Sequence, residues 1–323
     1  MTATVLEPPA PRAPQPQIDL RHAVMSRGRK LRNGLATTLM VLAFLVAALP
    51  LLFVLWTVVS KGISVIRADW FTKDIPDVGS FAAASNADAF GIAPTNVATP
   101  VYGMQPAIVG TLLTTGVAAL LAIPLGIMGA IYLNEYGKRG RMARTLRFFT
   151  DVMTGVPSIV MGLFLYTVFV VPQGTSGRSA IAGALALACL MLPIVVRATE
   201  EMLKLVPNNL REASAALGTR TWRTTLGVVL PAALPGVTSG CMLAIARAAG
   251  ETAPILLTVG STRFTNWSLA GVNTSLSREI YSNATQPGGD ALAWGAALTL
   301  IAIVLVMTLL ARFVTSKFAI RQT

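Results

Sequence analysis

Two ionisable residues, Arg247 and Glu251, stand four positions apart within the apolar stretch from Ala232 to Val259. On insertion scales, an ionised side chain at the centre of a bilayer costs about 2.5–3.5 kcal/mol. An ion pair at this spacing adds only about 0.2–0.5 kcal/mol to an isolated helix. Helix stability alone therefore does not explain the two charges, and we expect both to face the interior of a helix bundle.

The chemistry that suits this pair is the binding of an oxyanion. A guanidinium is planar and can donate to two anionic oxygens, and a dry pathway strengthens the contact. Glu251 would compete with the anion for Arg247 and so keep binding weak enough for passage. Thr252 offers a hydroxyl to the anion, or bonds back to its own helix. The alternative for Arg247 and Glu251 is a buried ion pair that only fixes helix packing.

Arg197 is a second candidate for the same pathway. It ends an apolar run and is followed by Glu200 and Glu201. A basic residue in this place also serves as an anchor on the cytoplasmic side of a membrane. Both interpretations remain open from the sequence.

A polar insert from Arg211 to Pro231 lies between two long apolar stretches. Asn209 is a suitable N-cap with Glu212 three residues later, and Gly218 is a natural C-terminal stop, so the spacing predicts a helix over Leu210–Leu217.

The rest of the insert predicts a second short helix, from Thr219 or Thr221 to near Pro231, on the cytoplasmic surface. The first helix carries a run of small residues: Ala213, Ser214, Ala215 and Ala216. Small side chains allow the backbone of a partner to approach, but they also simply favour a helix in a solvated loop.

The chain that positions these residues has the composition of an integral membrane protein. It is 54% hydrophobic and 12% charged, against about 25% charged residues in soluble domains. A crossing helix needs about 20 mostly apolar residues. Six runs meet this need, and we predict an all-α membrane protein with six transmembrane helices: Leu35–Val59, Ile108–Leu133, Val152–Val171, Ser179–Val196, Ala232–Val259 and Ala291–Ala311.

Charge placement orients these helices. The whole net charge of +12 falls on the two tails and on the loops after the second and fourth crossings, whereas the opposite loops are balanced. Short basic loops stay in the cytoplasm, so both termini are expected there. Because topology explains the basic excess, nucleic-acid binding is not indicated.

Enzymatic chemistry finds no support. The single histidine, His22, lies in the tail, and no phosphate-binding loop with a Gly-Lys-Ser/Thr ending occurs, so ATP hydrolysis by this chain is not expected. Cys189 and Cys241 fall within predicted crossings, so neither a metal site nor a disulfide is expected. The apolar run behind the tail is too long for a cleaved signal peptide.

Part of the insert resembles the EAA loop of ABC importer permeases. The matching residues are Glu212-Ala213-Ser214, then Gly218, then Val228-x-Leu230-Pro231, with Ser and Val where Ala and Ile are commoner. The resemblance implies that the short helix fits a cleft on a separate ATPase subunit. By this resemblance, Glu212 and Gly218 are the residues expected to couple the permease to the ATPase.

Four longer segments narrow the resemblance to PstA-type permeases of phosphate importers: AIVGTLLTTGVAALLAIPLGIMGAIYLNEYG from Ala107, GVPSIVMGLF from Gly155, LPIVVRATEEMLKLVP from Leu192 and AIARAAGETAPILLTVG from Ala244. Sulfate and molybdate permeases tend to have Gly-Glu-Phe-Gly where this chain has Gly250-Glu251-Thr252-Ala253-Pro254. The resemblance implies the type I (MetI-like) importer fold. It covers most of residues 105–315.

The expected organisation begins with a disordered, basic cytoplasmic tail (1–33), a first transmembrane helix (34–60) and an extracytoplasmic segment (61–104). A five-helix core (105–315) with a coupling loop at about 200–231 and a cytoplasmic tail (316–323) follow. The extracytoplasmic segment either contacts a receptor or lies at the headgroup level.

The resemblance also implies partners. These are a second, PstC-type permease subunit, two PstB-type ATPase subunits that use ATP and Mg²⁺, and a PstS-type phosphate-binding protein outside. No cofactor is expected on this chain. A secondary transporter or channel would also have intramembrane charges, but it would not need a capped helix with an exposed small-residue face.

Overall fold

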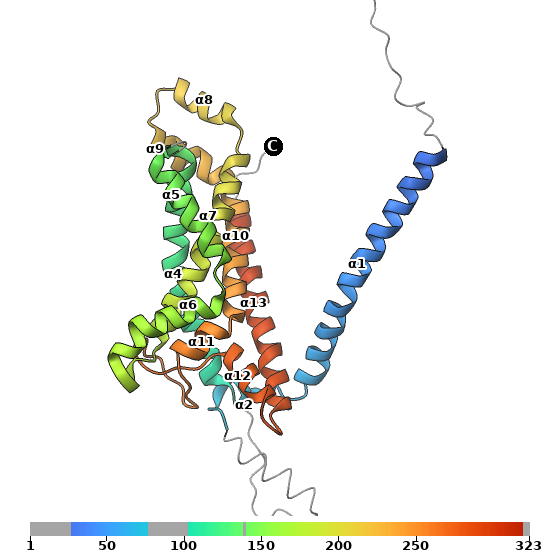
Figure 1. Ribbon diagram of the computed structural model, residues 1–323, viewed down its shortest axis with the longest axis vertical. Coiled ribbons are helices and arrows are strands. Elements are labelled where there is room, and N and C mark those ends of the chain that lie inside the picture. Colours follow the sequence, from blue (N-terminus) through green and yellow to red (C-terminus); the bar gives the residue numbers. More distant parts are fainter. Residues whose placement is uncertain (1–26, 77–102, 138–139, 319–323) are drawn as a thin grey trace, which may run out of the picture. The chain divides into compact units, whose positions relative to one another are not determined.

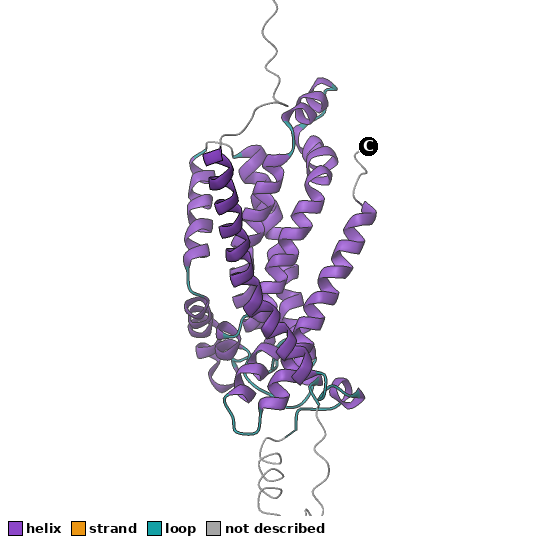
Figure 2. Ribbon diagram, turned by 90° about the vertical axis from the view of Figure 1, so that its right-hand side faces the viewer, coloured by secondary structure: helices purple, strands orange, loops and turns teal. Residues whose placement is uncertain are grey.

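The computed structural model describes residues 27–76, 103–137 and 140–318, and the regular elements in these ranges are all helical (Figure 2). The chain divides into two compact units, Met1–Leu55 and Trp56–Thr323. The expected basic tail lies largely outside the described residues, as does most of the expected extracytoplasmic segment.

The described part of the first unit is the beginning of helix α1, Arg27–Gly62, whose last residues belong to the second unit. The helix contains the predicted first crossing and begins eight residues before Leu35. It includes Pro50, which does not end it.

The second unit contains the remaining helices (Figure 1). The α-helices are α2 (Ala68–Thr72), α4 (Gln105–Ile131), α5 (Arg141–Gly155), α6 (Ser158–Leu165), α7 (Ala180–Leu205), α8 (Asn208–Ala216), α9 (Thr221–Thr224), α10 (Leu230–Gly250), α11 (Ala253–Thr258), α12 (Leu276–Ala284) and α13 (Asp290–Phe318). Three π-helical segments, η2 (Tyr132–Tyr136), η3 (Tyr166–Val170) and η5 (Thr225–Val229), and a 3-10 segment, η4 (Val171–Ser176), join them.

The long helices of the second unit run between two ends (Figure 1). Helices α8 and α9 lie at one end, which we call the α8 end. Helices α2, α11 and α12 lie at the other, which we call the α12 end. Five helices of the described chain are long and apolar enough to cross a membrane, or six if the bent pair α5 and α6 counts as one crossing. The chain is thus a multi-pass membrane protein.

Small residues let α4, α7 and α10 pack closely. A Cβ on Gly126 of α4 would lie 2.7 Å from Cγ1 of Val195 in α7. A Cβ on Gly240 of α10 would lie 2.4 Å from Cβ of Ala198, also in α7. Because hydrocarbon offers no hydrophobic drive between helices, such close contact is what holds membrane helices together. Helix α7 therefore forms the centre of the bundle.

The expected third crossing, Val152–Val171, is wrong as a single straight helix. The chain bends by 104° between α5 and the segment that begins at Ser158. Pro157 lacks an N–H group and disfavours the helical region for the residue before it. Val156 accordingly has φ −72° and ψ 126°, an extended conformation.

The expected fifth crossing, Ala232–Val259, is also wrong in its bounds. A continuous helix begins at Thr221, passes through Pro231 and ends at Gly250. The chain is then broken at Glu251, with φ −71° and ψ 123°, before the short helix α11. Pro254 has no N–H to bond the carbonyl four residues earlier, which favours the break.

The polar insert differs from its prediction in two ways. Helix α8 begins at Asn208 with Pro207 as its N-cap, so Asn209 is not the cap. The second helix does not stop near Pro231 but continues into α10 through the π-helical segment η5. A π-helical segment relaxes the hydrogen-bond pattern just where a proline enters the helix. The stop at Gly218 is confirmed by its φ of 74°.

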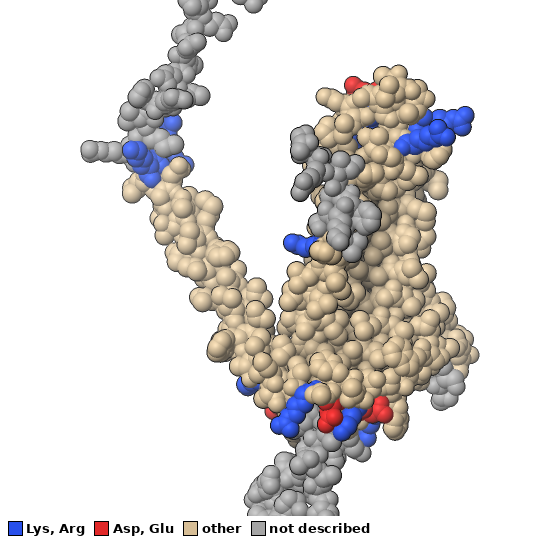
Figure 3. All heavy atoms as spheres, turned by 180° about the vertical axis from the view of Figure 1, so that it is seen from behind, with Lys and Arg blue, Asp and Glu red and all other residues tan. Residues whose placement is uncertain are grey.

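Charged side chains mark the two ends of the second unit. In Figure 3 most of its flank is formed by neutral residues, and Lys, Arg, Asp and Glu gather mainly at the ends. This is the distribution expected for helices that cross a hydrocarbon layer.

Candidate functional site

Helix α8 presents the small-residue face expected from the sequence. Glu212, Ala213, Ala215 and Ala216 are exposed on it. Ser214 is buried and does not belong to that face. Four exposed positions at the tip of one end can meet a partner, whereas Ser214 has an internal role.

The hydroxyl of Ser214 lies in a cluster that closes the turn after α8. Its Oγ is 2.6 Å from Oγ1 of Thr219 and 2.8 Å from Oγ1 of Thr224. Thr219 also donates from Oγ1 to the carbonyl oxygen of Ser214, at 2.7 Å. The cluster ties α8 to α9, so the third position of the motif stabilises the loop itself.

Gly218 is the hinge of this turn. Its φ of 74° lies in the left-handed region, where a side chain is strained. A Cβ at this position would meet nothing within 4 Å, so the demand for glycine is purely conformational. Leu230 and Pro231 lie beyond the loop, at the start of α10, and are half-buried.

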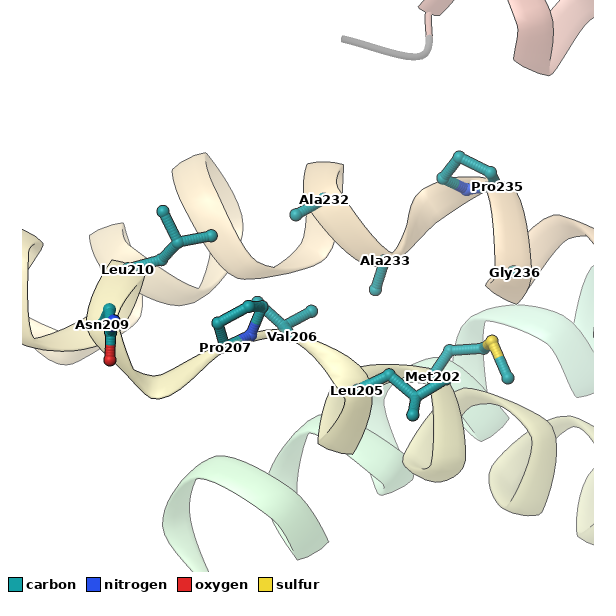
Figure 4. Close-up of a pocket in the computed structure, with 10 residues that line it drawn as sticks. All are labelled: Met202, Leu205, Val206, Pro207, Asn209, Leu210, Ala232, Ala233, Pro235 and Gly236. Atoms are coloured by element: carbon teal, nitrogen blue, oxygen red, sulfur yellow. The ribbon is translucent and has the colours of Figure 1, made fainter. Parts of the chain in front are cut away.

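A pocket of about 530 Å³ lies between the end of α7, with the first residues of α8, and the start of α10 (Figure 4). Val206 and Pro207 of the α7–α8 connection lie opposite Ala233 of α10 in this view. The lining is almost entirely apolar: Met202, Leu205, Val206, Pro207, Asn209, Leu210, Ala232, Ala233, Pro235 and Gly236. Helix α8 instead contacts α9 and η5, the segments that lead into α10.

Arg247 and Glu251 form the expected ion pair, with 3.5 Å between Nε and Oε1. The Arg247 side chain is 67% exposed and that of Glu251 is 19% exposed. The expectation that both face the interior is therefore wrong for Arg247, which projects from the surface of this chain. A residue on this surface faces either lipid or a second subunit.

The break after α10 positions Glu251. Its backbone is extended, and its carbonyl oxygen accepts a hydrogen bond of 3.1 Å from Oγ of Ser277, in the first turn of α12. Thr252 is the N-cap residue of α11 without a side-chain capping bond. The carboxylate is thus carried by a fixed backbone rather than by a continuing helix.

Arg197 lies inside α7 rather than at its end, because α7 continues to Leu205. It is paired with Asp151 of α5, and both side chains are about half exposed, at 44% and 48%. The neighbouring Ala198 touches α10 at Gly240. Arg247 lies seven residues farther along α10, about 10 Å at 1.5 Å per residue. The two arginines are therefore on adjacent helices but have separate partners.

Sequence reasoning missed a buried carboxylate, Glu200. It is 1% exposed, and its Oε1 lies 3.0 Å from Nε of Arg147 and 2.9 Å from Nζ of Lys204. The i,i+4 spacing to Lys204 was a signal available in the sequence. No pattern could have pointed to Arg147, which comes from α5, 53 residues away.

The α12 end contains a second buried polar group. Glu279 accepts hydrogen bonds from Oγ1 of Thr274 at 2.7 Å and from Nδ2 of Asn283 at 3.2 Å. Burial lowers the pKa of the adjacent Arg278 below its usual value, an effect that Glu279 opposes and Arg178 reinforces. Within the described ranges, no group of three or more His, Cys, Asp or Glu side chains is arranged to hold a metal ion.

Solved structures of ABC transporters share this architecture. A bacterial ABC transporter involved in the import of the acidic polysaccharide alginate aligns with a TM-score of 0.56 at 13% identity, over 89% of this chain and 99% of that chain. The inward-facing MetNI methionine ABC transporter aligns with a TM-score of 0.52 at 20% identity, over 66% of this chain and 93% of that chain. Likeness at these identities establishes the fold alone.

The sequence decides the family. The family described as binding-protein-dependent transport system inner membrane component matches residues 122–320. The chain belongs to this family. As such a membrane component it is a transport subunit and not an enzyme.

Two curated relatives align with this chain over most of its length. The phosphate transport system permease protein PstA 1 of Mycobacterium tuberculosis is 45% identical over 296 residues, which are 90% of this chain and 91% of that protein. The phosphate transport system permease protein PstA of Pasteurella multocida is 37% identical over 286 residues, 88% of this chain and 94% of that protein.

Proposed function

We propose that this chain is the permease subunit of an ATP-driven importer of inorganic phosphate in a bacterial plasma membrane. The observation that carries the proposal is the 45% identity, over 90% of the chain, to a relative named as a phosphate permease. Both termini and α8 lie on the cytoplasmic side in this proposal, because the basic excess gathers there. The chain forms one half of the translocation pathway.

The proposed function implies partners for this subunit. The tip of α8, with exposed Glu212 and small residues around it, fits a cleft on a separate ATPase subunit that uses ATP and Mg²⁺. Two such subunits, PstB-type, would serve this chain and a second, PstC-type permease. A PstS-type binding protein would deliver phosphate from outside. The exposure of Arg247 on the surface of this chain supports a pathway shared with the second permease.

Arg247 and Glu251 are the residues we assign to the phosphate pathway, with Thr252 and Arg197 as further candidates. The pair is held at 3.5 Å and Arg247 remains 67% exposed, so much of the guanidinium is available to an anion. Phosphate would displace Glu251 from Arg247 and later be displaced by it. Such competition keeps the site weak enough for release.

The experiment that tests the function is the ATPase activity of the complex reconstituted in proteoliposomes with its binding protein. Phosphate should stimulate hydrolysis and be taken up, whereas sulfate and molybdate should not. Stimulation by sulfate or molybdate alone would assign the chain to another oxyanion. Uptake without an ATPase subunit would point to a secondary transporter.

The site assignment is tested by Arg247→Gln and Arg247→Lys at matched membrane expression. Loss of one charge-assisted contact, worth about 1.5–3 kcal/mol, should lower phosphate uptake by Arg247→Gln at least about tenfold. Arg247→Lys should retain more uptake than Arg247→Gln, because it keeps the charge without the planar fork. Near-normal uptake by Arg247→Gln would make the pair structural.

A further inference from the structure

Arg211 precedes Glu212 in α8, but its side chain folds back toward the bundle. It is only 21% exposed, and all five of its N–H groups can be assigned to acceptors. Nε donates to the carboxylate of Glu135 at 3.3 Å. Nη1 donates to the carbonyl oxygen of Val206 at 2.7 Å and to Oδ1 of Asn208 at 3.3 Å. Nη2 donates to Oε1 of Glu135 and to the carbonyl oxygen of Leu203, each at 2.9 Å.

Glu135 receives this guanidinium at the end of α4. It is 8% exposed and lies in the π-helical segment η2, which interrupts the regular helix before the chain leaves it. Its Oε1 also accepts a hydrogen bond of 2.8 Å from Nδ2 of Asn134. π-Helical segments are frequent at functional sites, and here one carries the carboxylate that Arg211 of α8 binds.

The same guanidinium caps α7. Leu203 and Val206 offer carbonyl oxygens at the C-terminal end of that helix, where the last carbonyls lack partners within the helix. A cation is favoured there by the helix dipole. A single side chain of α8 therefore binds the ends of both α4 and α7, which pack against each other along the bundle.

The other neighbours of α8 hold it differently. The hydroxyl cluster of Ser214, Thr219 and Thr224 fastens it to α9. The apolar pocket lies between the first residues of α8 and the start of α10 (Figure 4). A push on α8 would therefore reach α4 and α7 through Arg211, and it would reach the continuous helix Thr221–Gly250 through the hydroxyl cluster.

We propose that Arg211 and Glu135 form the joint through which movement of α8 is passed to α4 and α7. The inference rests on the proposed function, since it assumes that a partner ATPase displaces α8. Arg211 is a positioning residue that touches neither phosphate nor nucleotide. Lysine cannot replace it, because three donors on a flexible stem cannot reproduce a five-donor planar fork.

The test compares variants of the complete complex in proteoliposomes, with phosphate uptake and ATP hydrolysis measured on the same sample. Arg211→Gln should still copurify with the ATPase subunits, but phosphate moved per ATP hydrolysed should fall about tenfold. Arg211→Lys should show a similar fall although the charge is kept. Arg220→Gln is the matched control, because Arg220 is exposed on the same loop and should leave the ratio unchanged.

A double-mutant cycle distinguishes the joint from two independent defects. Because each single variant already breaks the joint, Arg211→Gln with Glu135→Gln should lose no more coupling than the worse single variant. Additive losses would overturn the proposal, as would an unchanged ratio of phosphate to ATP in Arg211→Gln. Loss of the ATPase subunits from Arg211→Gln would also overturn it, by making Arg211 a docking residue.

A second measurement keeps Arg211 and Glu135 unchanged. It tests the proposal even if the variants at these two positions fail to fold. Spin labels at exposed Ala215 of α8 and exposed Tyr136 of η2 report the distance across the joint. That distance should stay the same between nucleotide-free and ATP-bound complexes, and a change would overturn the proposal. If the unmodified complex takes up no phosphate, the proposed function fails, but this distance still tests the joint.

Discussion

The charges at the α8 end and those farther along α10 are held in different ways. Glu200 and Glu135 are 1% and 8% exposed, and each is bound by more than one side chain. Arg247 is 67% exposed and meets Glu251 in a loose pair at 3.5 Å. The first group is buried and ties helices together. The second keeps bonding capacity for a ligand or a partner.

The largest effect on stability is expected from removing the charge of the buried carboxylate of Glu200. Glu200→Gln leaves Arg147 and Lys204, which are 32% and 54% exposed, facing an amide instead of a carboxylate. Hydrogen bonds to charged groups contribute about 1.5–3 kcal/mol. The thermal unfolding midpoint of the detergent-solubilised complex should fall clearly. Glu201→Gln is the matched control, because Glu201 is exposed on the same helix. Equal midpoints for the two variants would contradict the comparison.

A smaller effect is expected at the hinge of the α8 loop. Gly218→Ala places a side chain at a φ of 74°, a conformation that costs about 1–2 kcal/mol. Gly227→Ala is the control, since a Cβ there also meets nothing within 4 Å but φ is not positive. ATPase binding and thermal midpoint should both fall for Gly218→Ala alone. Equal ATPase binding and equal midpoints in the two variants would show that the backbone at position 218 does not require glycine.

The smallest effect on stability is expected from the half-exposed pair of Arg197 and Asp151. Exposed ion pairs contribute about 0.2–1 kcal/mol. A double-mutant cycle of Arg197→Gln and Asp151→Asn, measured by thermal unfolding, should therefore give a coupling free energy near the lower end of this range, about 0.2 kcal/mol. A large coupling free energy would show that this pair contributes to stability as the buried charges of the α8 end do, and would contradict the comparison. Reduced phosphate uptake with an unchanged midpoint would instead support Arg197 as a pathway residue.

Prolines show why helix boundaries were only partly predictable. Pro124, Pro193 and Pro235 lie inside α4, α7 and α10, whereas the chain bends at Pro157 and breaks before Pro254. In a membrane, neighbouring helices and polar side chains compensate for the hydrogen bond that a proline removes. Whether they do so depends on contacts that the sequence does not display.

In the insert, the sequence predicted the role of some residues and not of others. Gly218 was predictable because only its own backbone conformation demands glycine. Ser214 was placed on a partner-facing surface, yet its hydroxyl meets Thr219 and Thr224 once the chain turns back. Arg211 looked like one more cytoplasmic charge, and its partner Glu135 is 76 residues away.

The sequence by itself determined that the chain crosses a membrane several times and that a short helix interrupts those crossings. Both conclusions depend on local properties, namely the free energy of placing each side chain in hydrocarbon and the backbone preferences of capping residues. Only the tertiary structure decided which charges are satisfied and which keep bonding capacity. That outcome depends on distances between helices far apart in the chain, and neither hydropathy nor spacing contains those distances.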